Sequence, residues 1–307
     1  MLGDGGATEL EPVAELPGGK LLARQNLPPL SSHRIRQDEK KRSEVATLRH
    51  YMSEIPDTPT TRVIADNAKL LTMRFAWERL TPSVYRCRVP FCDVTVGLIR
   101  GRDGALLVDT ATTLTEAGAI EEDVRQLTTC SVTHIVLTHK HFDHVLGSSF
   151  FTDAEIHCAP EVADYLTTAH DQIRADALGY GADAAEIDRA IAALRPPRRG
   201  LYDAVIDLGD RDVRVTHPGR GHTTSDLIVV VPGLDDHDRH VVFAGDLVEE
   251  SADPAIDADS DVAAWPATLD RVRAIGGHDA IYVPGHGKIV DADFIRRQRA
   301  WLQQRSS

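Results

Sequence analysis

Seven consecutive residues, Thr138–His144, contain four side chains that can bind a metal ion, and they constrain the fold more than any other stretch. The apolar run 135–137 before them predicts a buried strand, and the residues from 145 onward predict a helix. The loop between them therefore lies at the rim of a sheet. In an extended segment His139 and His141 point the same way and can hold one ion, while Asp143 and His144 fall on the next turn of chain, so two ions are conceivable.

The donor types in this loop are imidazole nitrogen and carboxylate oxygen, with no thiolate nearby. Zinc, iron and manganese all bind such a set, so the donor types do not distinguish among these metals. The alternative interpretation is a solvated polar loop in which histidines cluster by chance. We favour a metal or catalytic site, because ligating side chains gathered at the end of a strand are what such a site requires.

The composition limits the class of protein and its partners. The chain has 307 residues, 42% of them hydrophobic, which is enough for one large or two small domains with a core. The formal net charge is −13 and the isoelectric point is about 5.5, so nucleic acid is not an expected partner. The four cysteines are isolated from one another, and no segment has the length and apolarity of a signal peptide or a membrane span. We therefore expect a cytoplasmic protein with no membrane partner.

Three regions are predicted along the chain. Residues 1–35 are rich in Gly, Pro and Leu without periodicity and predict a disordered leader. Residues 36–82 form a predicted N-terminal helical extension, in which 38–55 is one amphipathic helix that could pack on the body or form a homo-oligomer. Residues 83–307 are the predicted catalytic domain, which contains a helical insertion at about 160–200. The last helix of this insertion is predicted to start at Asp183–Glu186 and to end at Pro196–Pro197.

Within the predicted domain, short β-type runs and helical patterns alternate. A capping box, Thr113–Glu116, predicts the start of a helix that extends to Leu127. Helices are also predicted over 262–275 and near the C-terminus at Phe294–Trp301. Strands are predicted at 84–89, 94–99, 105–109, 134–138, 155–158, 204–208, 213–217, 227–231, 241–244 and 280–283. The order predicts an α/β fold of two packed sheets with helices outside.

Three later places resemble the first loop, because a His or Asp follows an apolar strand beside glycine. They are Gly219–His222, Phe243–Asp246 and Val283–Gly287. Each alone is more typical of a plain turn. Together with the HxHxDH loop they indicate a shared site.

In these motifs and their order, the chain from about Val84 to His286 resembles the metallo-β-lactamase superfamily, in its general hydrolase branch that includes glyoxalase II-like thioesterases and lactonases. The resemblance implies a four-layer αββα sandwich with the site along one edge. It also implies ligand sets for two divalent ions, with Asp246 bridging them and Asp109 orienting a ligand histidine; capping of the following helix is the alternative role for Asp109. The implied ligands are His139, His141 and His222 for one metal, and Asp143, His144 and His286 for the second, with Asp143 and Asp246 as the catalytic carboxylates.

Seven protein ligands on two ions leave a position for a shared water, as a catalytic site needs. We therefore expect a dinuclear metal-dependent hydrolase, with zinc first and iron or manganese as alternatives, that uses a metal-bound hydroxide on the carbonyl of an ester, thioester or lactone. The substrate is expected to be a small molecule, with specificity set by the insertion and by the loop after Asp246. Tyr180 and Tyr202 are candidate donors to the substrate carbonyl, although a structural role is the simpler interpretation for either.

Three other functions remain open at this point. Zinc β-lactamases of the most familiar type carry a Cys where this chain has Asp246, which argues against a β-lactam hydrolase. A mono-iron persulfide dioxygenase would use only one of the two ligand groups, and here both are present. A non-catalytic metal-binding protein is the least favoured alternative, because the ligand set is intact.

Overall fold

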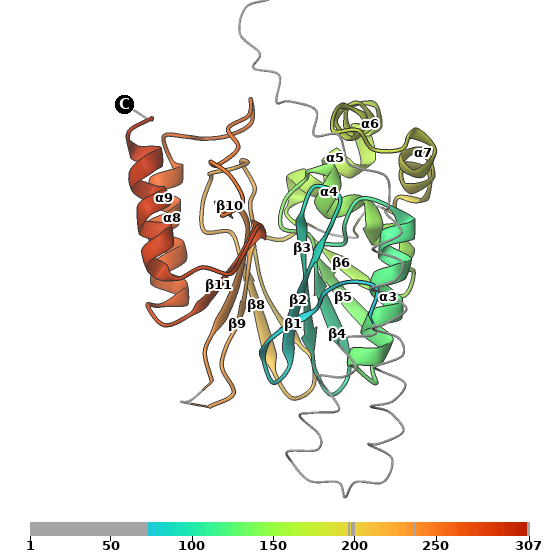
Figure 1. The fold of residues 1–307 in the computed structure, drawn as a ribbon, viewed down its shortest axis with the longest axis horizontal. Helices are drawn as coiled ribbons and strands as arrows, with labels where there is room; N and C mark the ends of the chain where they lie inside the picture. Colours follow the sequence, from blue (N-terminus) through green and yellow to red (C-terminus); the bar gives the residue numbers. More distant parts are fainter. Residues whose placement is uncertain (1–72, 196, 198–199, 236–237, 306–307) are drawn as a thin grey trace, which may run out of the picture.

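Two groups of strands lie side by side, with helices on the outer face of each (Figure 1). The computed structural model describes residues 73–195, 197, 200–235 and 238–305. The predicted leader and the helix predicted over 38–55 lie outside the described residues. The four-layer αββα architecture predicted from the sequence is confirmed, with α3 outside one group of strands and α8 and α9 outside the other.

The first group of strands comprises β1 (Glu78–Thr81), β2 (Val84–Val89), β3 (Val94–Arg100), β4 (Ala105–Val108), β5 (Val132–Val136) and β6 (Glu155–His157). The second comprises β7 (Asp203–Asp207), β8 (Asp212–Thr216), β9 (Ile228–Val231), β10 (Val241–Glu249) and β11 (Ile281–His286). The helices are α3 (Leu114–Leu127), α4 (Phe142–Val145), the 3-10 helix η1 (Leu146–Phe150), α5 (Pro160–Thr168), α6 (His170–Gly179), α7 (Ala184–Ala193), α8 (Trp265–Gly276) and α9 (Ala292–Gln303).

Backbone pairing connects both groups into one eleven-stranded sheet, in the order β6-β5-β4-β3-β11-β10-β9-β8-β7, with β2 beside β3 and β1 beside β2. The two halves meet through one residue pair, His286 with Val94. The two sheets expected from the sequence are therefore halves of a single sheet that folds over on itself. This junction places the end of β11, and with it a candidate ligand, at the seam between the halves.

Side-chain alternation in β10 shows how the sheet separates two cores. Val241 and Phe243 join the larger apolar cluster, whereas Val242 and Ala244 join the smaller one. The smaller cluster contains Trp265 of α8, so it lies between the sheet and the outer helices. Because both faces of this strand are buried, its sequence is a continuous apolar run instead of an alternating one.

The body of the protein begins before the predicted boundary at residue 83. Strand β1 pairs with β2, and Trp77 before it is buried. The buried carboxylate of Asp123 on α3 accepts hydrogen bonds from the backbone N–H groups of Arg74 and Phe75 and from Trp77 Nε1. The assignment of residues up to 82 to a helical extension is therefore wrong for residues 73–82, because a contact far along the chain fixes them to the sheet.

The helical insertion is confirmed as three helices, α5, α6 and α7, between β6 and β7. Asp183 caps α7 by accepting hydrogen bonds from Ala185 N and Glu186 N, both at 3.0 Å, as the sequence predicts. The capping box on α3 is also present, with Thr113 and Glu116 bonded reciprocally.

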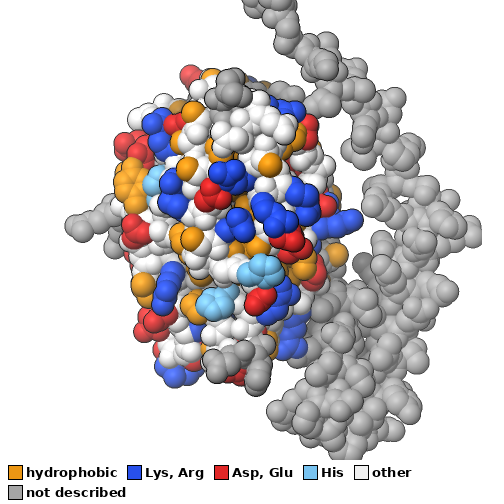
Figure 2. Space-filling view, turned by 90° about the vertical axis from the view of Figure 1, so that its left-hand side faces the viewer, with side chains coloured by type: hydrophobic (Ala, Val, Ile, Leu, Met, Phe, Trp, Pro, Cys, Tyr) orange, Lys and Arg blue, Asp and Glu red, His pale blue; other side chains and the backbone are white. Residues whose placement is uncertain are grey.

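The face that carries α8 and α9 has charged side chains of both signs interspersed with apolar ones (Figure 2). Ion pairs neutralise part of this charge, for example Arg299 with Asp270 at 2.7 Å and Arg296 with Asp293 at 3.3 Å. None of the helices in the described part of the chain is long and apolar enough to cross a membrane.

Candidate metal centre

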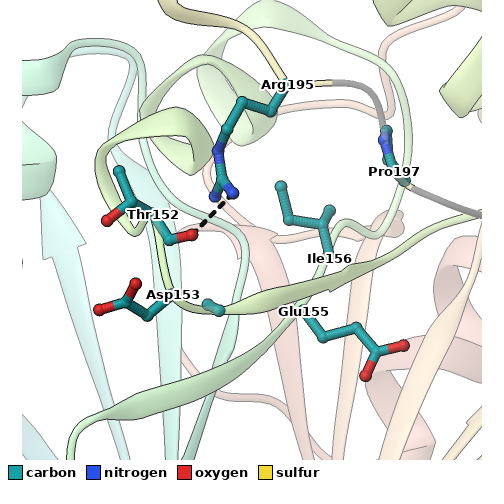
Figure 3. A pocket seen from close by; sticks show the side chains of 7 residues that line it. Thr152, Asp153, Glu155, Ile156, Arg195 and Pro197 are labelled. Carbon is teal, nitrogen blue, oxygen red and sulfur yellow. Dashed lines mark hydrogen bonds between the residues drawn. The ribbon is translucent and has the colours of Figure 1, made fainter.

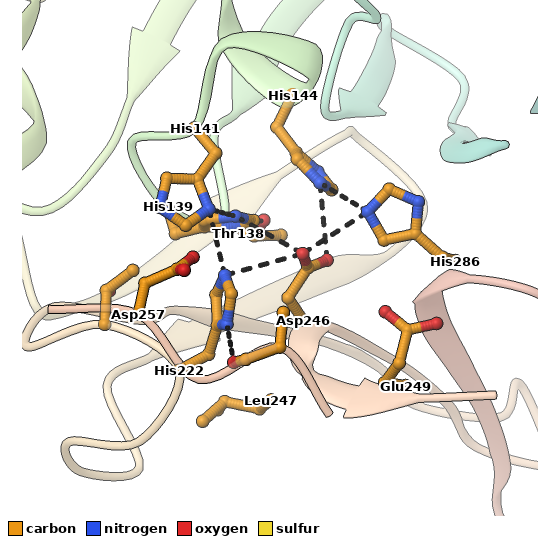
Figure 4. Close-up of polar contacts among 12 residues, drawn as sticks. Thr138, His139, His141, His144, His222, Asp246, Leu247, Glu249, Asp257 and His286 are labelled. Atoms are coloured by element: carbon orange, nitrogen blue, oxygen red, sulfur yellow. Dashed lines mark hydrogen bonds and ion pairs between the residues drawn. The ribbon is translucent and has the colours of Figure 1, made fainter. Parts of the chain in front are cut away.

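The HxHxDH loop leaves the end of β5 and enters the short helix α4, as the strand–loop–helix pattern predicts. Its side chains point inward: His139, Asp143 and His144 are buried, and His141 is half-buried. His222, Asp246 and His286 reach the same place from the loop after β8, from β10 and from the end of β11 (Figure 4). The structure thus brings together all seven residues that the sequence nominated.

One group of donors consists of three imidazole nitrogens. His141 Nδ1 lies 3.2 Å from His139 Nε2 and 2.9 Å from His222 Nε2. A tetrahedral zinc ion with Zn–N bonds of about 2.0–2.1 Å separates its ligands by roughly 3.3 Å, so these spacings are those of nitrogens around one ion. A chain of hydrogen bonds explains the contacts less well, because both would have to use the single nitrogen His141 Nδ1.

A second group lies beside the first. His144 Nε2 is 3.3 Å from His286 Nε2, and Asp143 Oδ2 is 3.6 Å from the former and 3.5 Å from the latter. All three ligand atoms lie within 4.8 Å of one another, as they must to hold one ion. The mixture of two imidazoles and a carboxylate again suits zinc, iron or manganese.

Asp246 lies between the two groups. Its Oδ2 is 3.5 Å from His222 Nε2 and 3.3 Å from His286 Nε2, and its Oδ1 is 3.3 Å from His144 Nε2. Oδ1 is buried and accepts no hydrogen bond of acceptable geometry. A buried carboxylate oxygen without a hydrogen bond is costly unless a cation completes it, so Asp246 fits a position between two ions.

The backbone around Asp246 leaves room for its carboxylate. A Cβ on Gly285 would stand 1.8 Å from Asp246 Oδ1, which no side chain can do without moving the carboxylate. Gly245 itself has a φ of +51°, in the left-handed region that favours glycine. The glycines noted in the sequence beside Asp246 and His286 therefore serve the site by their lack of a side chain.

Each histidine that presents Nε2 to the centre has a partner for its other ring nitrogen. His144 Nδ1 donates to Asp109 Oδ2 at 2.8 Å, His222 Nδ1 to the carbonyl of Ala255 at 3.2 Å, and His286 Nδ1 to the carbonyl of Cys92 at 2.9 Å. Since carboxylate and carbonyl oxygens only accept, these bonds place a proton on Nδ1 and turn Nε2 toward the centre, where it can bind a metal.

Asp109 bonds to both ends of the HxHxDH loop, Thr138 and His144. Besides His144, its carboxylate accepts from Thr138 N and Thr138 Oγ1, each at 2.8 Å. Thr138 Oγ1 in turn lies 3.0 Å from His139 Nδ1 and can accept its proton. The alternative role of Asp109 as a helix cap is wrong, because Thr113 caps α3.

Burial and charge divide the histidines into two types in the chain without metal. Burial lowers the pKa of His139 well below its usual value and that of His222 to about 4. Burial opposes protonation of His144 and His286 too, but the neighbouring carboxylates, Asp246 above all, outweigh it; the pKa of His144 is raised well above its usual value and that of His286 to about 9. The same histidines hold the pKa of Asp246 well below its usual value although burial opposes this.

This division predicts a pH dependence of metal loading that differs between the two groups. His286 is protonated below about pH 9, so an ion at Asp143, His144 and His286 must displace a proton. Its affinity should fall roughly tenfold for each pH unit below 9 for each displaced proton. His222, with a pKa of about 4, is already neutral at pH 6, so the other ion should stay. Zinc titrations at pH 6 and pH 9 that give equal stoichiometry and affinity would contradict this.

Three further charged residues beside the centre were not nominated from the sequence. Glu249 is buried, with its pKa raised to about 7 by burial and by Asp246. It was missed because β10 continues to Glu249, past the strand end predicted at Ala244. Lys140 and Asp259 pair at 2.7 Å next to His141. No local pattern identifies Asp259, since it comes from a loop far along the chain.

Among the other histidines, His134 Nδ1 and His157 Nε2 lie 3.2 Å apart on β5 and β6, and Glu155 completes a group that could hold an ion. Neither histidine was predicted as a metal ligand from the sequence. His217, which lies close to His222 in sequence, instead bonds the carbonyl of Asp226 at 2.7 Å.

A cavity of about 700 Å³ opens above the metal centre, and Tyr180 lies on its wall. Tyr202 does not line it: its hydroxyl donates to Glu161, so its candidate role as a substrate donor is not supported. A smaller hollow of about 340 Å³ lies beside β6 (Figure 3). Arg195 reaches into it and donates to the carbonyl of Thr152 at 2.7 Å, but none of its described lining residues is a histidine. The chemistry therefore belongs to the larger cavity.

A known protein family matches the part of the chain that contains the candidate metal centre. The family described as the metallo-beta-lactamase superfamily matches residues 89–286, more than half of the chain, and this range contains all seven nominated ligands.

Two curated relatives are each named metallo-beta-lactamase type 2. The one from Bacteroides fragilis is 28% identical over 111 residues, covering 35% of this chain and 43% of the relative. The one from Bacillus cereus is 24% identical over 175 residues, covering 53% of this chain and 55% of the relative. The chain thus spans about half the length of the curated relatives that it matches.

Solved structures agree in fold. The DIM-1 metallo-beta-lactamase superimposes with a TM-score of 0.58 at 17% identity, covering 76% of this chain and 98% of that one. The FIM-1 enzyme from Pseudomonas aeruginosa, in its mono-zinc form, gives 0.57 at 18% identity, covering 76% and 96%. At these identities the likeness establishes the architecture alone.

Proposed function

The chain belongs to the metallo-beta-lactamase superfamily, and we propose that it is a dinuclear metal-dependent hydrolase of an ester, thioester or lactone of a small molecule. Zinc is the first candidate metal, with iron or manganese as alternatives. Family membership and the clustered donors support metal-dependent hydrolysis in general. The number of ions, their identity and the substrate class are our proposal.

A single observation carries the proposal: two complete groups of donors meet on one carboxylate, Asp246, at the floor of an open cavity. A structural ion is closed off by four protein ligands, whereas a catalytic ion keeps a position for water or substrate. Here His141, Asp143 and His286 all line the cavity, so a substrate could reach both groups of donors.

Divalent ions bound at such a site lower the pKa of water toward neutrality and polarise a carbonyl oxygen. The protein residues supply the geometry for this chemistry. Asp109 and the carbonyl groups of Cys92 and Ala255 fix the histidine rings. The depressed pKa of Asp246 keeps its carboxylate ionised between the two groups at neutral pH.

The runner-up is a β-lactam hydrolase, which the names of the curated relatives favour. Against it stands Asp246, where the most familiar zinc β-lactamases carry a cysteine. A persulfide dioxygenase-like oxidoreductase needs one iron, so it does not explain why Asp143, His144 and His286 form a second group of donors. A non-catalytic metal-binding protein does not account for the open cavity.

The experiment that tests the function is a panel of thioesters, lactones, esters, β-lactams and phosphodiesters, offered to metal-free and zinc-loaded protein. We expect zinc-dependent turnover of an ester, thioester or lactone and none of the phosphodiesters. Turnover confined to β-lactams would support the runner-up. Failure of the loaded protein on every carbonyl substrate would contradict the proposal.

A further inference from the structure

The walls of the catalytic cavity carry an excess of negative charge. Asp176 on α6 and Asp257 and Asp259 in the loop after β10 line it above the metal centre. Lys140 is the sole lysine or arginine among the described lining residues. The carboxylates Asp143, Asp246 and Glu249 also line the cavity, but they belong to groups that could hold a metal ion, so they do not count toward the charge of the walls.

The charge of Lys140 is already neutralised. Its Nζ lies 2.7 Å from Asp259 Oδ2 and 4.8 Å from the centre of the Tyr165 ring. A substrate carboxylate would have to displace Asp259 from this contact and leave that aspartate without its partner. Lys140 therefore offers little to an anionic substrate.

Asp176 and Asp257 have no such partner. Asp176 Oδ1 accepts from Gln172 Nε2 at 2.8 Å, which is a neutral donor, and neither aspartate pairs with a lysine or arginine among the described residues. Each aspartate acts on a tyrosine of the cavity wall. Burial and then Asp176 and Asp259 raise the pKa of Tyr165 to about 12, and burial and then Asp257 raise the pKa of Tyr180. The walls between these carboxylates are aromatic, with Phe142, Tyr165 and Tyr180.

We infer that the cavity selects carbonyl substrates that have an apolar, uncharged or cationic substituent and rejects those that carry a carboxylate or phosphate. Unpaired wall carboxylates repel an anionic group, while aromatic rings receive apolar groups and quaternary ammonium ions. Asp176 and Asp257 are the specificity-determining residues. This inference rests on the proposed function, because it names the substrate class of the same site.

The test uses matched p-nitrophenyl esters of hexanoic acid, glutaric acid and trimethylammonium-terminated butyric acid, offered to the zinc-loaded protein at low ionic strength. We expect kcat/KM for the anionic glutarate to be lower than for the other two by about tenfold or more, with a smaller gap at high salt. Calorimetry with the corresponding unreactive amides should give the same order of affinity.

The variants Asp176→Asn and Asp257→Asn should each raise kcat/KM for the glutarate ester several-fold and lower it for the cationic ester, with the hexanoate ester nearly unchanged. Asp171→Asn is the control, because Asp171 is on the same helix, α6, and does not line the cavity. Equal turnover of the three esters would overturn the inference and leave the proposed function standing. No turnover of any ester, thioester or lactone would overturn both.

Discussion

Replacing Asp246 with Asn is expected to lower turnover by a factor on the order of a hundred or more and to weaken metal binding. The change keeps the shape of the side chain and removes its charge. The neighbouring histidines hold the pKa of Asp246 well below its usual value, and the carboxylate lies within 3.3–3.7 Å of four histidines from both donor groups. An amide offers one neutral oxygen where two cations need a shared anion. Elemental analysis and steady-state kinetics on the same preparation give both readouts.

Asp226→Asn is a matched control in the same part of the molecule. Asp226 is also fully buried, and burial raises its pKa to about 8, so its carboxyl is largely uncharged at pH 7. It accepts from Thr223 N and Thr223 Oγ1, bonds that an Asn oxygen can accept in part. This variant should keep both metals and most of its turnover. If Asp246→Asn behaves in the same way, Asp246 is not a bridging ligand.

Asp109→Asn is expected to lower metal affinity or turnover by about tenfold to a hundredfold, although Asp109 is placed outside both donor groups. The reason is that the N–H₂ group of an asparagine donates hydrogen bonds, whereas Asp109 only accepts them. The carboxylate accepts from Thr138 N, Thr138 Oγ1 and His144 Nδ1, and an amide group would turn a donor toward at least one of these. His144 would then lose the bond that fixes its ring. Zinc titration should show the loss, with partial rescue by excess zinc.

The control for a purely structural effect is Asp123→Asn. Asp123 is another buried aspartate that accepts three N–H groups, from Arg74, Phe75 and Trp77. Its replacement should lower the free energy of unfolding and leave the affinity for zinc unchanged. Loss of stability without loss of zinc affinity in Asp109→Asn as well would show that Asp109 only holds the fold.

The candidate ligands could be predicted from the sequence because the patterns that identify them are local. His139 and His141 alternate in an extended loop, and Asp143 and His144 open the next helix. Asp246 and His286 each stand beside glycines whose small size the site requires. Strand and helix positions were predicted within a few residues, since periodicity and capping boxes such as Thr113–Glu116 act over a few residues.

The features that could not be predicted depend on contacts between distant segments. Strand β1 was assigned to a helical extension because only its pairing with β2 and the docking of Trp77 on Asp123 show that it belongs to the sheet. The union of both halves into one sheet depends on one pair, Val94 with His286. Asp259 and Asp176 reach the cavity from a loop and from the insertion, and neither has a sequence signal of its own.

The most direct test of the proposed dinuclear site is the metal content of the purified protein, measured together with its turnover. The experiment uses His134→Ala protein, so that an ion held by His134, Glu155 and His157 is not counted. We expect close to two divalent ions per chain, and turnover of a carbonyl substrate that is lost when both ions are removed and restored when zinc is added back. One tightly held iron per chain, unchanged by added zinc or manganese, would contradict it.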